Sequence, residues 1–284
     1  MRDILVFGFN GQVATELRKS NRVIALNRID ANLNNPLSCY EAIKNLNPKA
    51  VINAAAFTLV DDAEEQKELS FIVNAEAPRS MAIACKELEI PLVHISTDYV
   101  FDGVLAQPLK PSDKTNPLNV YGKSKLKGEN YVLESNCIYA ILRTSWVFSP
   151  FGKNFVKTML KLSTEREELA IVEDQISAPT SAKSIAKASL CIADELIKDY
   201  RKSGIYHYSG QPYVSWLDFA KIIFKITNSN IKIKGINTKD YIQSANRPLN
   251  TMLDCSSTQK KFGISRPHWY SDLQETINII RESE

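Results

Sequence analysis

The chain has 284 residues, of which 44% are hydrophobic and 24% charged, and this composition is that of a globular protein with a large core. A net charge of +3 without a basic stripe gives no reason to expect nucleic acid as a partner. Five scattered cysteines without a C-x-x-C pair predict reduced thiols, and three scattered histidines predict no structural zinc site. No apolar run approaches the roughly 20 residues of a membrane span, so we expect a cytoplasmic protein without a membrane partner.

Short apolar runs alternate with helical patterns through the first half of the chain. The predicted strands are 4–7, 23–26, 50–54, 92–96 and 139–143, and the predicted helices are 11–20, 38–46, 70–88 and 119–133. These strands are continuous apolar runs, which is typical of strands that are buried on both faces of a parallel sheet. The alternation therefore predicts an α/β fold with a doubly wound parallel sheet, the Rossmann arrangement.

The second half of the chain is less regular. Its predicted helices are 154–162, 182–197, 215–226 and 272–280, and proline-containing loops separate them. We expect a smaller C-terminal lobe packed over the edge of the sheet rather than a tethered domain. The chain 1–284 is then one unit, in which 1–145 is mainly the Rossmann core and 146–284 is mainly the lobe, with elements that return to the core.

A glycine-containing loop joins the first predicted strand to the first predicted helix. Gly8 permits a tight turn there, and Gly11 lets the backbone approach a pyrophosphate at the helix N-terminus. The spacing is G-x-x-G-x-x-A rather than G-x-G-x-x-G, but Ala14 is small enough for the helix to pack closely on the strand. A plain strand–helix turn is the alternative to a dinucleotide site. The predicted cofactor-binding residues of this loop are Gly8, Asn10, Gly11, Gln12 and Val13.

The end of the second predicted strand bears on the choice between NADPH and NADH. An acidic residue at this place would bind the ribose 2′-hydroxyl of NAD, but the sequence has Asn27 followed by Arg28. A guanidinium can pair with the 2′-phosphate of NADPH. The pattern favours NADPH as the cofactor and leaves NADH open, and a solvated surface arginine is the alternative interpretation of Arg28.

Tyr121 and Lys125 lie four residues apart in a predicted helix and therefore on the same face. A free phenol has a pKa of about 10, and a nearby ammonium is expected to lower the pKa of Tyr121 so that it exchanges a proton readily. The same ammonium can bind the nicotinamide ribose. This spacing also arises by chance, and a surface tyrosine beside a solvated lysine is the alternative. The position after the fourth strand favours the catalytic interpretation.

The fourth strand ends in polar residues at the sheet edge where α/β proteins bind ligands. A hydroxyl from Ser96 or Thr97 can hold a carbonyl oxygen beside Tyr121. Asp98 and Tyr99 follow directly, either as substrate contacts or as a loop cap and a packing residue. The sequence thus predicts a nicotinamide-dependent reductase of a carbonyl compound.

These features resemble the extended short-chain dehydrogenase/reductase family, and more of the chain resembles its dTDP-4-dehydrorhamnose reductase branch. The segments that carry the resemblance span nearly the whole chain in family order. They are 8–13, VINAAA at 51–56 with Val60-Asp61, STDYVFDG at 96–103, PLNVYGKSKLKGE at 117–129, RTSWV at 143–147, Asn154-Phe155 with Thr158-Met159-Leu160, Asp174-Gln175 with APT at 178–180, and Arg247-Pro248.

The resemblance implies reduction of the C4 ketone of dTDP-4-dehydro-β-L-rhamnose to dTDP-L-rhamnose by NAD(P)H, in nucleotide-sugar biosynthesis for surface polysaccharide. It implies that Tyr121 donates the proton, that Lys125 anchors the ribose, and that Thr97 assists at the carbonyl. Residues 1–145 would mainly bind NAD(P) and residues 146–284 the substrate. The resemblance adds Ala56, Phe57 and Thr58 as cofactor-binding residues, and Asp98, Tyr99, Trp146 and Arg247 as substrate-binding residues. Arg247 would pair with the diphosphate, and a surface residue before proline is the alternative.

Some members of this family dimerise through a magnesium ion held by glutamates. Glu16 matches one such position, but Lys183 stands where another glutamate would be. Because a lysine repels a cation, we predict no metal-binding residues. The predicted state is a monomer or a homodimer without a metal-linked interface.

Two other functions remain open at this point. One is reduction of another nucleotide-linked 4-keto-deoxysugar, because product stereochemistry depends on loop placement. The other is a non-catalytic role like that of the regulatory β subunit of methionine adenosyltransferase, a binding protein that this branch also resembles. The presence of Thr97, Tyr121 and Lys125 favours an enzyme.

Overall fold

A computed structural model describes residues 3–282 of the chain. The first half contains β1 (Ile4–Phe7), α1 (Gln12–Leu17), β2 (Val23–Leu26), α2 (Pro36–Leu46), β3 (Ala50–Asn53), α3 (Val60–Glu65), α4 (Lys67–Phe71), the π-helix η1 (Ile72–Glu76), α5 (Ala77–Glu87), β4 (Pro91–Thr97), the 3-10 helix η2 (Asp98–Val100), α6 (Val120–Glu134) and β5 (Ile138–Thr144). The second half contains β6 (Val147–Phe148), α7 (Phe155–Glu165), β7 (Glu168–Val172), β8 (Ile176–Ser177), β9 (Thr180–Ser181), α8 (Ala182–Lys198), η3 (Tyr200–Lys202), β10 (Gly204–His207), β11 (Val214–Ser215), α9 (Trp216–Thr227), β12 (Lys232–Ile236), η4 (Thr238–Asp240), α10 (Ser256–Phe262) and α11 (Trp269–Glu282).

Six parallel strands form one sheet in the order β10-β5-β4-β3-β1-β2. Every residue of β1 and β3 is buried, which explains why these strands are continuous apolar runs. The chain places β2 on one side of β1 and then β3 on the other, so the strand order reverses between β1 and β3. The crevice outside the carboxyl ends at such a point is where α/β proteins bind ligands. The predicted doubly wound sheet is confirmed.

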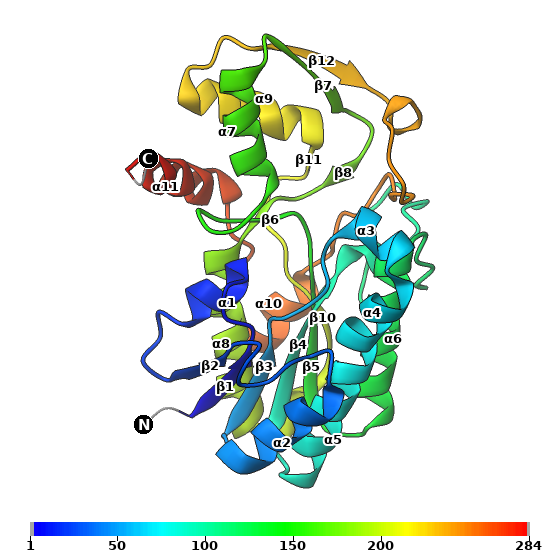
Figure 1. Ribbon diagram of the computed structural model, residues 1–284, viewed down its shortest axis with the longest axis vertical. Helices are drawn as coiled ribbons and strands as arrows, with labels where there is room; N and C mark the ends of the chain where they lie inside the picture. Colours follow the sequence, from blue (N-terminus) through cyan, green and yellow to red (C-terminus); the bar gives the residue numbers. More distant parts are fainter. Residues whose placement is uncertain (1–2, 283–284) are drawn as a thin grey trace.

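Helices cover both faces of the sheet (Figure 1). On one face α1 and α8 pack through small and apolar side chains such as Ala14, Leu17 and Ile192. On the other face α2 and α5 supply Ile43 and Met81 to a second cluster, which α6 completes. Both clusters are apolar layers between the helices and the sheet, and burial of apolar surface is the main contribution to the stability of the fold.

The second half of the chain divides its elements between two places. A third apolar cluster joins α7, α9 and α11 around Phe219 and Trp269, and this lobe lies beyond the carboxyl ends of the strands rather than beside the outermost strand (Figure 1). By contrast, α8 packs on the sheet, and β10 pairs with β5 as its sixth strand. The lobe therefore faces the end of the sheet where the crevice lies.

The predicted helix 70–88 is helical but not uniform. In the structure, α4 and α5 are joined through the π-helix η1, and α5 starts with Pro78 in its first turn. A π-helical turn takes one more residue than an α-helical turn, and such turns occur frequently at functional sites. The apolar residues of 70–88 keep a helical spacing through it, which is why the pattern alone predicts an uninterrupted α-helix.

Several short elements were not predicted. They include β10, α3, α10 and the parallel pair of β7 with β12 in the lobe. The strands β7 and β12 are only partly buried, so they lack the continuous apolar run that identifies the core strands. The strand β10 is a four-residue edge strand, Gly-Ile-Tyr-His, and its position in the sheet comes from pairing rather than from local propensity.

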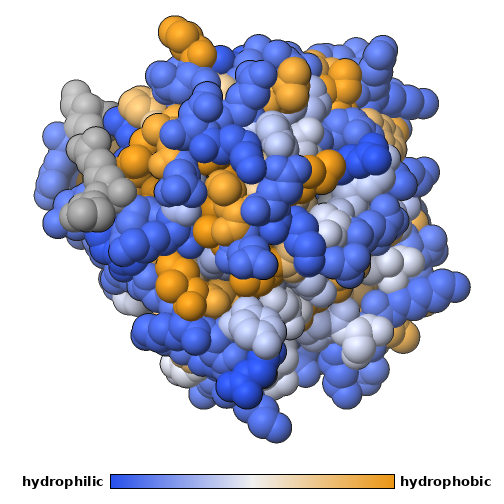
Figure 2. All heavy atoms as spheres, turned by 90° about the horizontal axis from the view of Figure 1, so that it is seen from below, coloured by the Kyte–Doolittle hydropathy of each residue, from blue (hydrophilic) through white to orange (hydrophobic). Residues whose placement is uncertain are grey.

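The surface at the opposite end from the lobe is mostly hydrophilic. Figure 2 shows this face from below, with apolar side chains in small groups between polar ones. None of the helices within residues 3–282 combines the length and the apolar composition of a membrane span.

Helix α6 approaches η1 so closely that only glycine fits at the contact. A Cβ on Gly128 would lie 2.1 Å from the backbone oxygen of Asn74. We predict that Gly128→Ala lowers the free energy of unfolding by about 1–3 kcal/mol, as overpacking does, measured by urea denaturation. Lys123→Ala, on the exposed side of the same helix, is the control and should change little. A gain of about 1 kcal/mol from helix propensity would show that the two helices separate without penalty.

Candidate active site

The predicted catalytic pair lies at the start of α6, beside the carboxyl end of β4. The side chain of Asn119 caps this helix by accepting a hydrogen bond from the backbone N–H of Gly122 at 2.8 Å. Tyr121 is therefore in the first turn and is partly exposed, whereas Lys125, one turn later, is only 2% exposed. The cap thus sets where the helix begins and hence which way both side chains project.

The ammonium of Lys125 has a fixed position. Its Nζ donates a hydrogen bond to the backbone oxygen of Ile95 on β4 at 2.7 Å. Burial lowers the pKa of Lys125 to about 8, and the carboxylate of Glu129, one turn further along α6, opposes that shift. Lys125 therefore carries its charge at neutral pH and loses it as the pH rises through about 8.

The pKa of Tyr121 differs from our expectation. Burial raises the pKa to about 12, although a hydrogen bond with the Thr97 hydroxyl works in the opposite direction. The predicted lowering of this pKa is thus wrong for the ligand-free protein, because the loss of hydration on burial dominates. Tyr121 is consequently a protonated phenol at neutral pH, the state from which a proton can be donated.

The two hydroxyls at the end of β4 have different surroundings. Successive residues of a strand point to opposite faces, and Ser96 donates a hydrogen bond to Oε1 of Glu129 at 2.5 Å. Thr97 instead contacts Tyr121, accepts from the backbone N–H of Tyr99 at 3.2 Å and donates to Asp98 at 3.1 Å. Of the two candidates that the sequence left open, the structure brings Thr97 to the catalytic pair.

Asp98 and Tyr99 lie directly beside Thr97. Asp98 is buried, and burial raises the pKa of its carboxyl to about 6. The hydroxyls of Thr251 and Thr97 act in the opposite direction but do not cancel this shift. It does not cap the loop, since Thr97 accepts the capping hydrogen bond. The ring of Tyr99 packs edge-on against Tyr121, with ring centres 5.9 Å apart. Both side chains therefore belong to the wall around Tyr121.

A buried ion pair supports this wall from behind. Glu129 and Arg143 are 1% and 3% exposed in their side chains, and Nη2 of Arg143 lies 2.7 Å from Oε2 of Glu129. A second donor, Nε of Arg143, lies 3.0 Å from Oε1. This bidentate geometry is the arrangement in which a buried pair offsets its loss of hydration. The predictions did not include Glu129, although its place four residues after Lys125 was a usable signal.

The glycine loop after β1 has the geometry that a dinucleotide requires. Gly8 has φ +113°, in the region that favours glycine, and a Cβ there would lie 3.3 Å from the Cβ of Ala14. Asn10 and Gly11 are exposed, and α1 has no side-chain cap, so its first N–H groups are open to a phosphate. Val13 is buried in the core beside β1.

Gln12 links this loop to the second half of the chain. Its Oε1 accepts hydrogen bonds from the hydroxyl of Ser149 at 2.9 Å and from Nδ2 of Asn154 at 3.1 Å. Asn154 is also the N-cap of α7 in the lobe. These hydrogen bonds hold the first turn of α1 against the first turn of α7.

The segment 56–58 follows β3 and is held by a residue that sequence reasoning missed. Asn74, in the π-helix, accepts from the backbone N–H of Phe57 at 2.8 Å and donates to its carbonyl oxygen at 3.0 Å. The same amide donates to the hydroxyl of Ser124 on α6 at 2.9 Å. Asn74 therefore connects the segment of the predicted cofactor residues Ala56, Phe57 and Thr58 to α6. An asparagine within an apolar helical pattern was the only signal.

Arg28 lies exposed just after the carboxyl end of β2. The side chain of Asn27 is occupied in the turn, where it accepts from the backbone N–H of Ile29 at 2.7 Å. The position is next to β1 and its glycine loop. A contact of Arg28 with the cofactor stays a prediction.

Trp146 lies between β5 and β6 with φ +44°, an uncommon conformation for a bulky residue. Its ring stacks on Trp216, with centres 3.5 Å apart and an interplanar angle of 8°. Phe155 continues the contact at 4.5 Å from Trp216. The strained backbone at Trp146 is held by this stack, which places an aromatic face between the sheet end and the lobe.

Arg247 is paired with a carboxylate of the protein itself. Its Nη2 lies 2.5 Å from Oδ2 of Asp61 on α3, and its Nη1 donates to the side chain of Gln243. The predicted alternative, a plain surface residue before a proline, does not describe it, since 19% of its side chain is exposed. Asp61 was not among the predicted residues.

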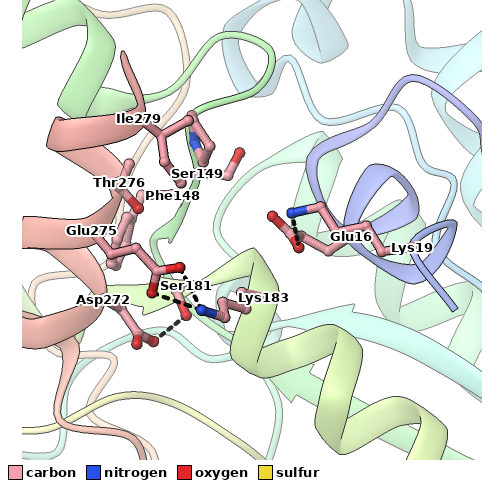
Figure 3. A pocket seen from close by; sticks show the side chains of 11 residues that line it. Glu16, Lys19, Phe148, Ser149, Ser181, Lys183, Asp272, Glu275, Thr276 and Ile279 are labelled. Atoms are coloured by element: carbon pink, nitrogen blue, oxygen red, sulfur yellow. Dashed lines mark hydrogen bonds and ion pairs between the residues drawn. The ribbon is translucent and has the colours of Figure 1, made fainter. Parts of the chain in front are cut away.

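Lys183 lies among acidic side chains at the junction of α1, α8 and α11 (Figure 3). Its Nζ lies 2.5 and 2.7 Å from the two carboxylate oxygens of Glu275, and Glu16 pairs with Lys19 at 2.7 Å. Within residues 3–282, no group of three or more His, Cys, Asp or Glu side chains is arranged to hold a metal ion. The oligomeric state stays a prediction.

The fold and this arrangement place the chain among the extended short-chain dehydrogenase/reductases. More narrowly, residues 1–282 match the family model described as the RmlD substrate binding domain, and the chain belongs to that family. A relative from Sinorhizobium fredii, named dTDP-4-dehydrorhamnose reductase, is 39% identical over 284 residues, which cover 96% of each chain. The family resemblance predicted from the motifs is confirmed.

Solved structures agree with this assignment. A dTDP-4-dehydrorhamnose reductase from Clostridium acetobutylicum superposes with a TM-score of 0.91 at 35% identity, covering 98% of this chain and 99% of the other. A reductase of the same name from Bacillus anthracis, in complex with NADP, gives a TM-score of 0.90 at 31% identity, covering 98% and 100%.

Proposed function

We propose that this protein reduces the C4 ketone of dTDP-4-dehydro-β-L-rhamnose to dTDP-L-rhamnose with NADPH, and accepts NADH less readily. The position of Tyr121 one helical turn before the charged Lys125, whose Nζ is fixed on the carboxyl end of β4 next to Thr97, carries the proposal. The names of the relatives specify the nucleotide sugar. The product would enter the synthesis of surface polysaccharide.

The residues present fit an NADPH molecule. The uncapped first turn of α1 and the exposed Gly11 suit the pyrophosphate, and Arg28 suits the 2′-phosphate. The segment held by Asn74 would line the nicotinamide end of the crevice. When bound, the reduced nicotinamide supplies the hydride that goes to C4.

The chain's own residues handle the proton. Tyr121 donates its phenolic proton to the ketone oxygen, and Thr97 holds that oxygen by a hydrogen bond. An alkoxide is a stronger base than a phenolate, so a phenol with a pKa of about 12 still gives up its proton. The ammonium of Lys125 then stabilises the resulting phenolate and binds the ribose, and Ile95 and Glu129 keep it in place and charged.

We further propose that Asp98, Tyr99, Trp146 and Arg247 contact the sugar nucleotide. The first two lie beside Tyr121, the stacked Trp146 offers an apolar face, and the guanidinium of Arg247 suits a diphosphate. Residues 1–145 would mainly bind the cofactor and 146–284 the substrate. The five free cysteines suit the cytoplasm, and the ion pair of Lys183 with Glu275 suits a monomer or a dimer without a bridging metal.

A substrate assay tests the proton donor. Wild-type protein with enzymatically generated dTDP-4-dehydro-β-L-rhamnose should oxidise NADPH, and failure to do so would refute the proposed reaction. Tyr121→Phe should reduce kcat by more than about tenfold, or roughly 1.4 kcal/mol, while the Kd for NADPH stays within about twofold of wild type. Tyr131→Phe, on the same helix, is the control. A smaller loss for Tyr121→Phe would mean that another group donates the proton.

Lys125 should determine the alkaline side of the pH profile. It is charged below its pKa of about 8 and neutral above it, so kcat/KM should fall as the pH rises past about 8, since this ratio reports the free enzyme. Arginine keeps its charge throughout this range. Lys125→Arg, although slower at every pH, should therefore lose the decline between pH 7 and 9. A wild-type profile that is flat over this range would contradict the assignment.

The cofactor preference rests on Arg28. Arg28→Ala should raise the KM for NADPH about tenfold, since a hydrogen bond to a charged group contributes about 1.5–3 kcal/mol, and should leave the KM for NADH nearly unchanged. Arg166→Ala, an exposed arginine of the lobe, is the control. Equal changes for the two cofactors would rule out a contact of Arg28 with the 2′-phosphate.

A further inference from the structure

A short segment of the second half reaches down to the first half and is bound there by one carboxylate. We call residues 243–248 the strap. Figure 1 shows the chain descending from β12 of the lobe toward α3. The strap carries Arg247, the predicted diphosphate partner, and it lies against α3, which begins seven residues after β3 ends.

The carboxylate is that of Asp61 in the first turn of α3. Its Oδ1 accepts hydrogen bonds from the backbone N–H of Ser244 at 3.1 Å and of Ala245 at 3.0 Å. The guanidinium of Arg247 adds Nη1 at 3.3 Å on Oδ1 and Nη2 at 2.5 Å on Oδ2. Four donors of the strap thus converge on one side chain, and two of them form a bidentate ion pair.

This carboxylate is ionised at neutral pH. Burial acts to raise the pKa of Asp61, but the guanidinium of Arg247 and the N–H groups of Ala245 and Ser244 outweigh it, so the pKa lies below the usual 3.8. The charge of Asp61 is in turn compensated by Arg247. An anionic ligand near the strap is therefore not repelled by an isolated carboxylate.

The pairing orients the guanidinium toward the catalytic wall. Arg247 lies close enough to Tyr99 to interact with it electrostatically, and the ring of Tyr99 packs against Tyr121. With one edge of the guanidinium on Asp61, the side chain cannot rotate away from Tyr99 without losing the bidentate pair. Asp61 thus determines where Arg247 points, although it lies on another element.

Two further contacts hold the strap, one at Asn246 and one at Pro248. Nδ2 of Asn119, the residue that caps α6, donates to the backbone oxygen of Asn246 at 2.8 Å. A Cβ on Gly103 would lie 2.7 Å from Pro248, so the strap packs directly on the backbone after η2. Both of these contacts are uncharged. Among residues 3–282, the carboxylate of Asp61 is the charged group that binds the strap.

We propose that Asp61 is a positioning residue, which holds the strap and Arg247 in the orientation that receives the diphosphate of the substrate. The proposal deepens the proposed function and rests on it. Asp61 makes no contact with the diphosphate itself, because a carboxylate repels that group. It acts through the two N–H groups and the guanidinium that it binds.

Asp61→Asn tests this role, because the variant keeps an oxygen acceptor and loses the charge. We expect the Kd for dTDP, measured by calorimetry, and the KM for the nucleotide sugar each to rise about tenfold. The kcat should change less than about threefold, and the Kd for NADPH less than about twofold. Amide hydrogen exchange over residues 243–248 should become faster. Asp62→Asn, the exposed neighbour in the same turn, is the matched control and should behave like wild type.

The dependence on Arg247 is tested in a double-variant cycle. Asp61→Asn should change the Kd for dTDP by less than about twofold when Arg247→Ala is already present. The same tenfold change in both backgrounds would overturn the proposal, as would a Kd within twofold of wild type for Asp61→Asn alone. If Asp61→Asn does not fold, Arg247→Ala breaks the pair from the other side, and unchanged exchange of the strap in that variant would equally overturn the proposal. Binding of dTDP and amide exchange need no turnover, so they test the strap separately from the reaction.

Discussion

The hydrogen bond from the Lys125 ammonium to the Ile95 carbonyl is the interaction on which the site depends. It joins α6 to the carboxyl end of β4, and both elements deliver a residue of the proposed catalytic set there. A buried ammonium needs compensation, and Glu129 supplies it one helical turn further along. Glu129 is itself held by Ser96 and Arg143. A single charge in the cleft therefore requires a polar network that extends through the helix to β5.

This network is possible only because α6 lies unusually close to its neighbours. A Cβ at Gly122 would lie 2.2 Å from the backbone oxygen of Tyr99, and one at Gly128 would lie 2.1 Å from that of Asn74. Two glycines weaken a helix by roughly 1 kcal/mol each, and here they permit contacts with η2 and η1. Asn74 binds both Phe57 and Ser124 of α6. The close approach of η1 and α6 therefore fixes the proposed cofactor segment relative to Tyr121.

Both halves of the chain contribute to the proposed site, and several polar contacts join them there. Gln12 binds Ser149 and Asn154 on the side of the glycine loop. Asp61 binds Arg247 and its strap on the side of α3. These contacts hold segments that are far apart in the sequence in a defined geometry.

The sequence by itself determined the layers of the fold, the glycine turn, and the shared face of Tyr121 and Lys125, because buried parallel strands and helical spacing are local patterns. It also indicated the family, through motifs that span the chain. Only the tertiary structure decided that Ser96 binds Glu129, that burial raises rather than lowers the pKa of the phenol, and that η1 interrupts the helix at Asn74. It alone paired Asp61 with Arg247, 186 residues apart. These outcomes depend on hydration, side-chain direction and contacts between distant segments, which no local pattern records.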